Sequence, residues 1–374
     1  MKRVLMAESS DIYRDGRVQK EACSLVKAGY GVTVLGFAES GRAKRIFPFK
    51  LITLPVAARN RRKLRNVCIF INVGLLNLRI LFTRVQVYHA HNTMFLWGMF
   101  LASRIYGGRF IFDSHEVQCE AGRLQAWLEK VFIRKADAVI NVSEGRADYQ
   151  ALQHSLPREK IIVIHNYPEF QEALWEKRQP TDRTQKLRMV FSGGFNLEDN
   201  RLDDFLRILT GIPNVELDLI AFGYGDSGER LKNVIQQMGL AETVKFLPLV
   251  PFKKLIPTLR SYDLAVDMLI NPEQSVSKRY PAINKTYEYF AAGLPIVCSD
   301  MEAFIEEVHN QGAGISINPF QIEEARKRII ELVSDRDKIE KMRATARQLS
   351  EKRYNWKFEE DRLIATYSKL LINR

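Results

Sequence analysis

Three polar residues open a predicted helix in the second half of the chain: Asn284, Lys285 and Thr286. The N–H groups at the start of a helix can receive an anion, and Lys285 would add a positive charge beside them. Glu288 follows about one turn later, where a carboxylate can accept hydrogen bonds from ribose hydroxyls. This spacing fits a site for a nucleotide diphosphate, but an ordinary capped helix with a solvated Glu288 fits it as well.

A second polar group, Asp113-Ser114-His115-Glu116, follows the apolar residues 110–112 of a predicted strand. Ligands of open α/β sheets bind beyond the carboxyl ends of the strands. His115 is therefore a candidate for the reaction centre, with Glu116 beside it. The alternative is a buried histidine whose ring nitrogens form hydrogen bonds within the protein and which has no role in a reaction.

His89 and His91 lie two residues apart on another predicted strand and so share one face. We expect His91 to reach the site at the strand end and His89 to lie further in, in a structural role. On the loop before the first helix, Gly16 eases a turn, and Asp15 and Arg17 are available to an acceptor or a phosphate. A charge pair at the helix N-terminus is the alternative for these two.

Strand and helix patterns alternate along the chain, which predicts parallel sheets covered by helices. A polar, charged stretch at 168–186 interrupts the alternation and is the candidate linker. The loop after the first strand lacks Gly-x-Gly-x-x-Gly, which argues against a nicotinamide-binding domain. We expect two Rossmann-like α/β domains facing each other across a deep cleft. The expected domains are 1–170 and 171–355, with a C-terminal helix, 356–374, that packs back on the first.

Composition limits the class of protein. The chain has 374 residues, 46% hydrophobic and 27% charged, which is ordinary for a globular protein of two domains. No secretory signal is evident at the N-terminus, and the longest uncharged apolar stretch, Val67–Leu78, is too short to span a bilayer. The cysteines occur singly, without spacing that holds zinc, so we expect reduced thiols, a cytoplasmic location and no metal; they are Cys23, Cys68, Cys119 and Cys298.

The formal net charge of +12 comes entirely from the first half of the chain. Between Glu39 and Asp113 there is no acidic residue, although 13 Lys or Arg fall in that interval. A basic cluster adjoins the apolar segment 67–82, which suits a helix lying on anionic lipid; the cluster is Arg59, Arg61, Arg62, Lys63 and Arg65. A core helix with a solvated basic entry is the alternative.

The segment 284–297 resembles the donor-nucleotide motif of retaining glycosyltransferases of the GT-B fold, in family four. Its sequence is Asn-Lys-Thr-Tyr-Glu-Tyr-Phe-Ala-Ala-Gly-Leu-Pro-Ile-Val. Other stretches resemble the same family in the same order along nearly the whole chain: 15–22, 89–91, 113–116, 136–144, 163–168, 239–247 and 261–266. The resemblance implies that His115 lies beside the transferred sugar and that the C-terminal domain binds the donor through Glu288, Lys285, Asn284, Thr286, Gly194, Arg201, Phe246 and Leu247.

The sequence departs from the commonest family pattern at two places. Tyr280 stands where an earlier Glu of the donor motif is usual, so another group must position the sugar hydroxyls. Gly194 and Asp199 stand where basic residues often grip the diphosphate, and Arg201 lies close enough to substitute.

These features together predict a metal-independent, retaining glycosyltransferase without a cofactor beyond its co-substrate. The donor is a UDP- or GDP-sugar, and the acceptor is a glycan or lipid-linked glycan at the inner face of the membrane. A nucleotide-sugar 2-epimerase is the alternative within the fold. A basic nucleic-acid-binding protein is the alternative from another class, but Arg59–Arg65 contains no interleaved aromatic residue, so we expect no nucleic-acid partner.

Overall fold

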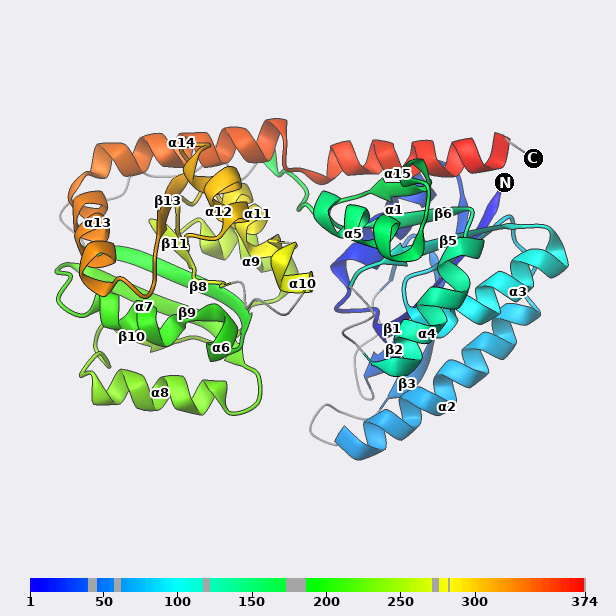
Figure 1. The fold of residues 1–374 in the computed structure, drawn as a ribbon, viewed down its shortest axis with the longest axis horizontal. Coiled ribbons are helices and arrows are strands. Elements are labelled where there is room, and N and C mark those ends of the chain that lie inside the picture. Colours follow the sequence, from blue (N-terminus) through cyan, green and yellow to red (C-terminus); the bar gives the residue numbers. More distant parts are fainter. Residues whose placement is uncertain are drawn as a thin grey trace. The chain divides into compact units, whose positions relative to one another are not determined.

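A computed structural model describes residues 1–39, 46–56, 62–116, 122–172, 186–270, 276–281 and 283–372. The backbone alone is described at 62–65, 252, 277 and 278. The chain divides into two compact units (Figure 1). Unit 1 comprises Met1–Asn166 and Glu359–Arg374, and unit 2 comprises Tyr167–Phe358. Each of them is an α/β domain built on a parallel sheet, as the sequence predicts.

Unit 1 contains a seven-stranded parallel sheet in the order β3-β2-β1-β4-β5-β6-β7. The strands are β1 (Arg3–Asp11), β2 (Gly31–Glu39), β3 (Lys50–Val56), β4 (Val87–Ala90), β5 (Arg109–Ser114), β6 (Ala138–Asn141) and β7 (Ile161–Val163). The helices are α1 (Gly16–Lys27), α2 (Arg62–Leu81), α3 (Leu96–Tyr106), α4 (Arg123–Phe132), α5 (Glu144–His154) and α15 (Trp356–Ile372). Short 3₁₀ turns lie at Thr93–Phe95, Ile133–Lys135 and Arg158–Lys160.

Helices cover both faces of this sheet. The core on one face joins Leu5, Leu35 and Phe112 of the strands to Leu76 of α2 and Met99 of α3. α2 packs beside α3, and α3 beside α4 (Figure 1). α1 and α15 are linked by an ion pair from Lys27 to Glu360, whose atoms are 3.7 Å apart. Because both faces of the sheet are covered, β4 and β6 are buried along their whole length, without an alternation of buried and exposed residues.

Unit 2 contains a six-stranded parallel sheet in the order β10-β9-β8-β11-β12-β13. The strands are β8 (Leu187–Phe195), β9 (Val215–Gly223), β10 (Val244–Phe246), β11 (Leu264–Asp267), β12 (Ile296–Ser299) and β13 (Gly314–Ile317). The helices are α6 (Leu197–Asn200), α7 (Leu202–Leu209), α8 (Ser227–Gln237), α9 (Phe252–Leu259), α10 (Val276–Arg279), α11 (Asn284–Ala291), α12 (Glu302–Phe304), α13 (Ile322–Ser334) and α14 (Arg336–Lys352). A π-turn, Ile305–His309, follows α12.

Two edge strands escape prediction from the sequence. β3 ends in Pro55-Val56, and a proline argues against a strand except at a sheet edge, which is where β3 lies. β13 has four residues and also lies at an edge. Most of the expected linker, residues 173–185, lies outside the described residues.

No helix in the described ranges is long and apolar enough to cross a membrane. Of the basic cluster, Arg59 and Arg61 lie outside the described residues. Arg62, Lys63 and Arg65 belong to the first turn of α2, where the backbone alone is described.

Candidate active site and donor site

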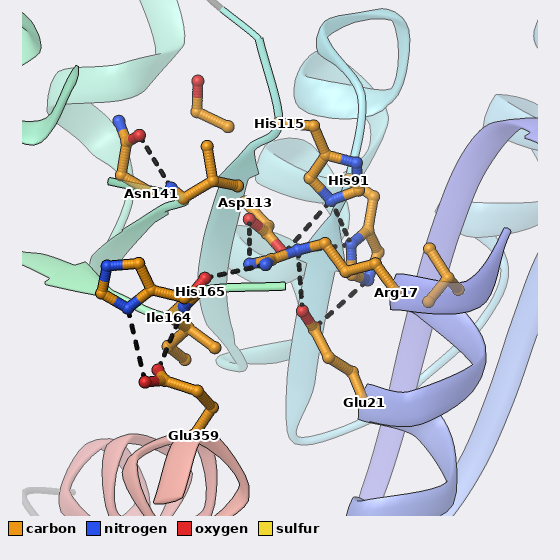
Figure 2. A network of polar contacts seen from close by, with 12 residues as sticks. Arg17, Glu21, His91, Asp113, His115, Asn141, Ile164, His165 and Glu359 are labelled. Carbon is orange, nitrogen blue, oxygen red and sulfur yellow. Dashed lines mark hydrogen bonds and ion pairs between the residues drawn. The ribbon is translucent and has the colours of Figure 1, made fainter. Parts of the chain in front are cut away.

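A buried arginine organises the carboxyl edge of the unit 1 sheet. Asp15 caps α1 by accepting a hydrogen bond from the Val18 N–H at 3.1 Å, and this places Arg17 in the first turn. The Arg17 guanidinium donates two hydrogen bonds to the Asp113 carboxylate, each 3.0 Å long, and a third to the Ile164 carbonyl at 2.8 Å (Figure 2). Arg17, which was expected on the acceptor side, is only 5% exposed, and its guanidinium N–H groups donate hydrogen bonds to other residues of unit 1.

Glu21 lies one helical turn beyond Arg17, with its Oε1 3.0 Å from the Arg17 Nε. Burial raises the pKa of Glu21 to about 8, and the charge of Asp113 adds to that effect, whereas Arg17 opposes it. The pKa of Asp113 moves the other way. Although burial favours its neutral form, Arg17 and His115 outweigh burial and hold the pKa well below its usual range. At neutral pH, Asp113 is therefore ionised and Glu21 carries a proton.

His115 is the member of this cluster that reaches the surface. It is 22% exposed, whereas His91 and Asp113 are buried. Its Nε2 lies 3.2 Å from the Asp113 Oδ2 and 3.2 Å from the His91 Nδ1 (Figure 2). Burial lowers the pKa of His115, but the charge and hydrogen bond of Asp113 outweigh burial and raise the pKa to about 9. The imidazole is therefore a cation at neutral pH, suited to stabilise negative charge and unsuited to accept a proton.

Glu8, at the carboxyl half of β1, closes the other side of His115. Its Oε2 is 3.8 Å from the His115 Nδ1. Burial raises the pKa of Glu8 to about 8, against the opposing charge of His115, so Glu8 is mostly protonated at neutral pH. With Arg17 and His115 positive and Asp113 negative, the cluster keeps one net positive charge, which suits a phosphate.

His89 belongs to β4 and His91 follows directly after this strand, and their rings stack with centroids 4.1 Å apart. His89 is fully buried, and its Nδ1 lies 2.6 Å from the Tyr367 hydroxyl of α15. His91 reaches Asp113 and His115, and burial lowers the pKa of both His89 and His91. At neutral pH both rings are uncharged.

Glu21, His89, His91 and Asp113 offer donor atoms within 4.8 Å of one another, which is the spacing of a cation site. The Arg17 Nε lies 3.0 Å from both carboxylates. The guanidinium therefore already supplies the positive charge that balances the Asp113 carboxylate, and it would repel a divalent ion placed beside it.

The donor motif occupies the carboxyl edge of the unit 2 sheet. Lys285 donates a hydrogen bond to the Gly194 carbonyl at 3.2 Å, and its Nζ lies 4.2 Å from the centre of the Phe191 ring. Gly193 has a φ of +100°, and a Cβ there would lie 3.2 Å from the Lys285 Cε. Gly193 thus lets β8 pass directly against Lys285.

α11 begins at Asn284, which is exposed, and no side chain caps this helix. Thr286 is fully buried, and its hydroxyl has no hydrogen-bond partner in the described part of the chain. Burial lowers the pKa of Lys285, whereas Asp267 and Glu288 act against that effect. The first N–H groups of α11 therefore have no side-chain cap among the described residues, and Lys285 and Glu288 belong to the same helix.

Three other residues expected at the donor site lie elsewhere in unit 2. Phe246 ends β10, Leu247 follows it, and both are half-buried. Arg201 adopts a left-handed backbone conformation with a φ of 40°, and its guanidinium pairs with Asp204 and stacks on Phe320. Arg201 thus has an acidic partner of its own.

Tyr280, which stands at the position of the missing Glu, follows α10 and packs its ring against Arg279. Gly16 is the first residue of α1. Glu116 is exposed, and its carbonyl accepts a hydrogen bond from Ser114.

Sequence reasoning did not single out Glu8, Glu21 or Asp267. Glu21 carries a local signal, because it stands four residues after Arg17 on one helix face. Asp267 ends β11 beside Lys285, and burial raises its pKa. Glu8 carries no local signal, because its partner His115 is distant in sequence.

Both units are parallel α/β domains with polar clusters at the strand ends, and this architecture is that of GT-B glycosyltransferases. The family model "Glycosyl transferases group 1" matches residues 175–349, and "Glycosyltransferase Family 4" matches residues 18–167. The chain therefore belongs to the group 1 glycosyltransferases of the family-four type, which confirms the resemblance and the expected fold.

Similar proteins agree with this assignment. The uncharacterized glycosyltransferase MJ1069 of Methanocaldococcus jannaschii is 22% identical over 61% of this chain, and the match spans 57% of that protein. Sucrose-phosphate synthase from Thermosynechococcus elongatus has a TM-score of 0.76 at 13% identity, with both chains covered completely. Anabaena HepE in complex with UDP has a TM-score of 0.74 at 16% identity, covering 99% of this chain and 100% of its own. At such identities the solved structures show the fold.

Proposed function

We propose that this protein transfers a hexose from a UDP- or GDP-sugar to a glycan or lipid-linked glycan acceptor with retention of configuration. The observation that carries the proposal is the uncapped start of α11, with Lys285 and Glu288 beside it. The N–H groups and Lys285 suit the diphosphate, and Glu288 suits the ribose. Support comes from HepE, which is solved with UDP and with UDP-glucose.

The reaction breaks the bond between the anomeric carbon and the phosphate oxygen and forms a bond to the acceptor oxygen on the same face. The acceptor proton passes to the departing phosphate. His115 is a cation at neutral pH, so its role is to stabilise negative charge near the sugar or phosphate, with Glu116 beside it. Asp113 acts through His115 by holding its orientation and its positive charge, and Arg17 acts one step further away by holding Asp113. The positive charge of Lys285 and His115 supports a metal-independent reaction.

A thermal-shift screen against UDP, GDP, ADP and their sugars tests the donor site. A ligand at 100 times its dissociation constant stabilises a folded protein by about 2.7 kcal/mol, so the nucleotide that raises the melting temperature most shows which base the donor carries. Glu288→Ala should weaken that nucleotide by about 1 to 3 kcal/mol, the cost of a lost charge-assisted hydrogen bond. Unchanged calorimetric affinity in a folded variant removes Glu288 from the site.

Product analysis with the preferred donor separates transfer from 2-epimerisation. A transferase leaves the nucleotide and a glycosylated acceptor, with the anomeric configuration kept. Conversion of the donor to its C2 epimer without an acceptor would favour the epimerase instead.

We also propose that unit 1 binds the cytoplasmic surface of a membrane through α2, which would place the enzyme in cell-surface polysaccharide or lipopolysaccharide synthesis. α2 buries one face through Val73, Leu76 and Ile80. Its opposite face is apolar as well, and the residues of this outer stripe, with Phe82 directly after the helix, are each more than half exposed: Val67, Phe70, Ile71, Leu75, Leu78 and Phe82. An apolar stripe that follows a basic cluster is typical of an interfacial helix.

Replacing Arg61, Arg62 and Lys63 by Glu tests this placement. Each basic residue near an anionic surface is worth about 1 kcal/mol, and salt screens the attraction. The triple variant should no longer bind anionic liposomes but should keep its nucleotide affinity. If the wild-type protein does not bind anionic liposomes at low salt, the membrane proposal fails and the donor-site proposal is unaffected.

A further inference from the structure

A pocket of about 330 Å³ lies in unit 1, away from the polar cluster around His115. Its walls are the first residues of β1, β2 and β3, the end of α2 and the turn that follows α2. In a parallel sheet these strand beginnings form the edge opposite to the one that carries Asp113 and His115. A ligand in this pocket would therefore be distinct from the reacting sugar.

Four basic side chains line this pocket: Arg3, Lys50, Arg79 and Arg84. None of them forms an ion pair with any residue that the structure describes, and the described lining holds no Asp or Glu. The interval from Glu39 to Asp113, which supplies three of the four, is free of acidic residues. Unpaired cations gathered around one hollow create a positive potential that selects an anion.

Part of the pocket lining is apolar. Leu5, Leu35 and Ile52 belong to it, and Thr33 and Thr83 are two further lining residues. A ligand that fills it therefore needs an anionic group and an adjoining apolar part. A phosphate diester with its glycerol and the first atoms of an acyl chain has this character.

Phe82 connects the pocket to the outer stripe of α2. It lines the pocket, and at 83% exposed it is also the last residue of that stripe. A membrane surface that covers the stripe would bring lipid headgroups to Phe82 and so to the pocket that it lines.

We propose that this pocket binds the phosphate headgroup of an anionic phospholipid and so orients unit 1 on the membrane. The proposal rests on the membrane association of α2 proposed above and adds a specific site to it. The guanidiniums of Arg79 and Arg84 each present a fork-shaped set of donors that matches the oxygens of a phosphate. A carboxylate headgroup offers fewer acceptor oxygens and matches these donors less well.

The test compares two vesicle types at equal surface charge, phosphatidylcholine with phosphatidylglycerol and phosphatidylcholine with oleate. Wild-type protein should bind the phosphatidylglycerol vesicles more tightly, and Arg79→Glu/Arg84→Glu should lose at least about tenfold in affinity and lose the preference. Lys357→Glu/Lys369→Glu makes the same change in charge on exposed residues of α15 and should keep the preference. Equal binding of both vesicle types by the wild-type protein would overturn the proposal.

A soluble probe separates the pocket from the membrane surface. Dihexanoyl phosphatidylglycerol below its micelle concentration should shift the amide resonances of β1 to β3 in the wild type and not in the Arg79→Glu/Arg84→Glu variant. Inorganic phosphate should bind more weakly than the soluble lipid, because it makes no contact with the apolar part of the pocket lining. Equal or tighter binding of phosphate would identify a free-anion site instead. If vesicles fail to bind but the soluble lipid does, the membrane proposal fails and the headgroup site stands. If neither binds, both fail.

Discussion

At the scale of single residues, His115 is defined by the charges around it. Asp113 holds its imidazole as a cation with a pKa of about 9, and Arg17 holds Asp113 in turn. In the proposed reaction, such a fixed cation would stabilise the negative charge that develops in the transition state without any reorganisation.

His115→Ala should therefore lower the transfer rate by about 10²-fold or more, on the scale of one lost positioned polar group, while the bare nucleotide still binds. The check compares the turnover number with the dissociation constant of the nucleotide. His309→Ala, at an exposed histidine of unit 2, is the control. Near-normal transfer by His115→Ala would make His115 a structural residue.

The proton on Glu21 makes stability depend on pH. Its folded pKa of about 8 exceeds the ordinary carboxyl value, so the folded state holds a proton that the unfolded chain releases. The stability associated with Glu21 is therefore complete below about pH 4 and is lost as the pH rises through about 8.

Glu21→Gln keeps the shape of the protonated glutamate side chain and does not titrate. The melting temperature of this variant should therefore fall less between about pH 5 and about pH 8 than that of the wild type. Glu159→Gln, at an exposed glutamate, should follow the wild-type curve. Parallel curves for the wild type and Glu21→Gln would mean that Glu21 is ionised in the folded protein.

At the scale of elements, α15 holds two strand ends of unit 1. Its Glu359, which is 2% exposed, accepts a hydrogen bond from the His165 N–H at 3.0 Å, just beyond β7 (Figure 2). Its Tyr367 meets His89 on β4. The helix thus supports the neighbours of the His115 cluster.

Glu359→Ala should lower the free energy of unfolding by about 1 to 3 kcal/mol, because it leaves the His165 N–H without its acceptor. Glu359→Gln keeps an acceptor oxygen and should recover part of the loss. Urea unfolding followed by circular dichroism measures both variants. Equal stability of Glu359→Ala and the wild type would show that α15 is not needed there.

At the scale of the whole molecule, each unit has a hydrophobic core of its own. The cores of unit 2 use residues from Tyr167 to Tyr354, and the large core of unit 1 lies between Leu5 and Val163. All the proposed donor residues belong to unit 2. A domain with its own core can fold alone.

A fragment of residues 167–358 should therefore unfold cooperatively. Its dissociation constant for the preferred nucleotide should lie within about threefold of that of the full chain, well below the tenfold change that corresponds to about 1.4 kcal/mol. Residues 1–166 alone lack α15 and should be less stable than the same segment in the full chain. Calorimetry and thermal melts test both expectations. A folded fragment that fails to bind would mean that unit 1 supplies a needed nucleotide contact.

The sequence by itself determined the fold class and the position of the donor motif. Alternating apolar strands and amphipathic helices are local patterns, and they predicted most strands of both sheets. The segment 284–297 carries its chemistry within one helical turn and the following strand, so its residue types and spacing were enough to single out Lys285 and Glu288. The excess positive charge of the first half is likewise a property of composition.

Only the tertiary structure decided how the polar residues of unit 1 pair. Arg17 and Asp113 are 96 residues apart, and their contact depends on β1, β4 and β5 lying side by side. The charge states of His115 and Glu21 follow from burial and from these distant partners, neither of which is a local pattern. The same holds for the basic pocket, because the order of the strands gathers its walls from segments separated in the chain.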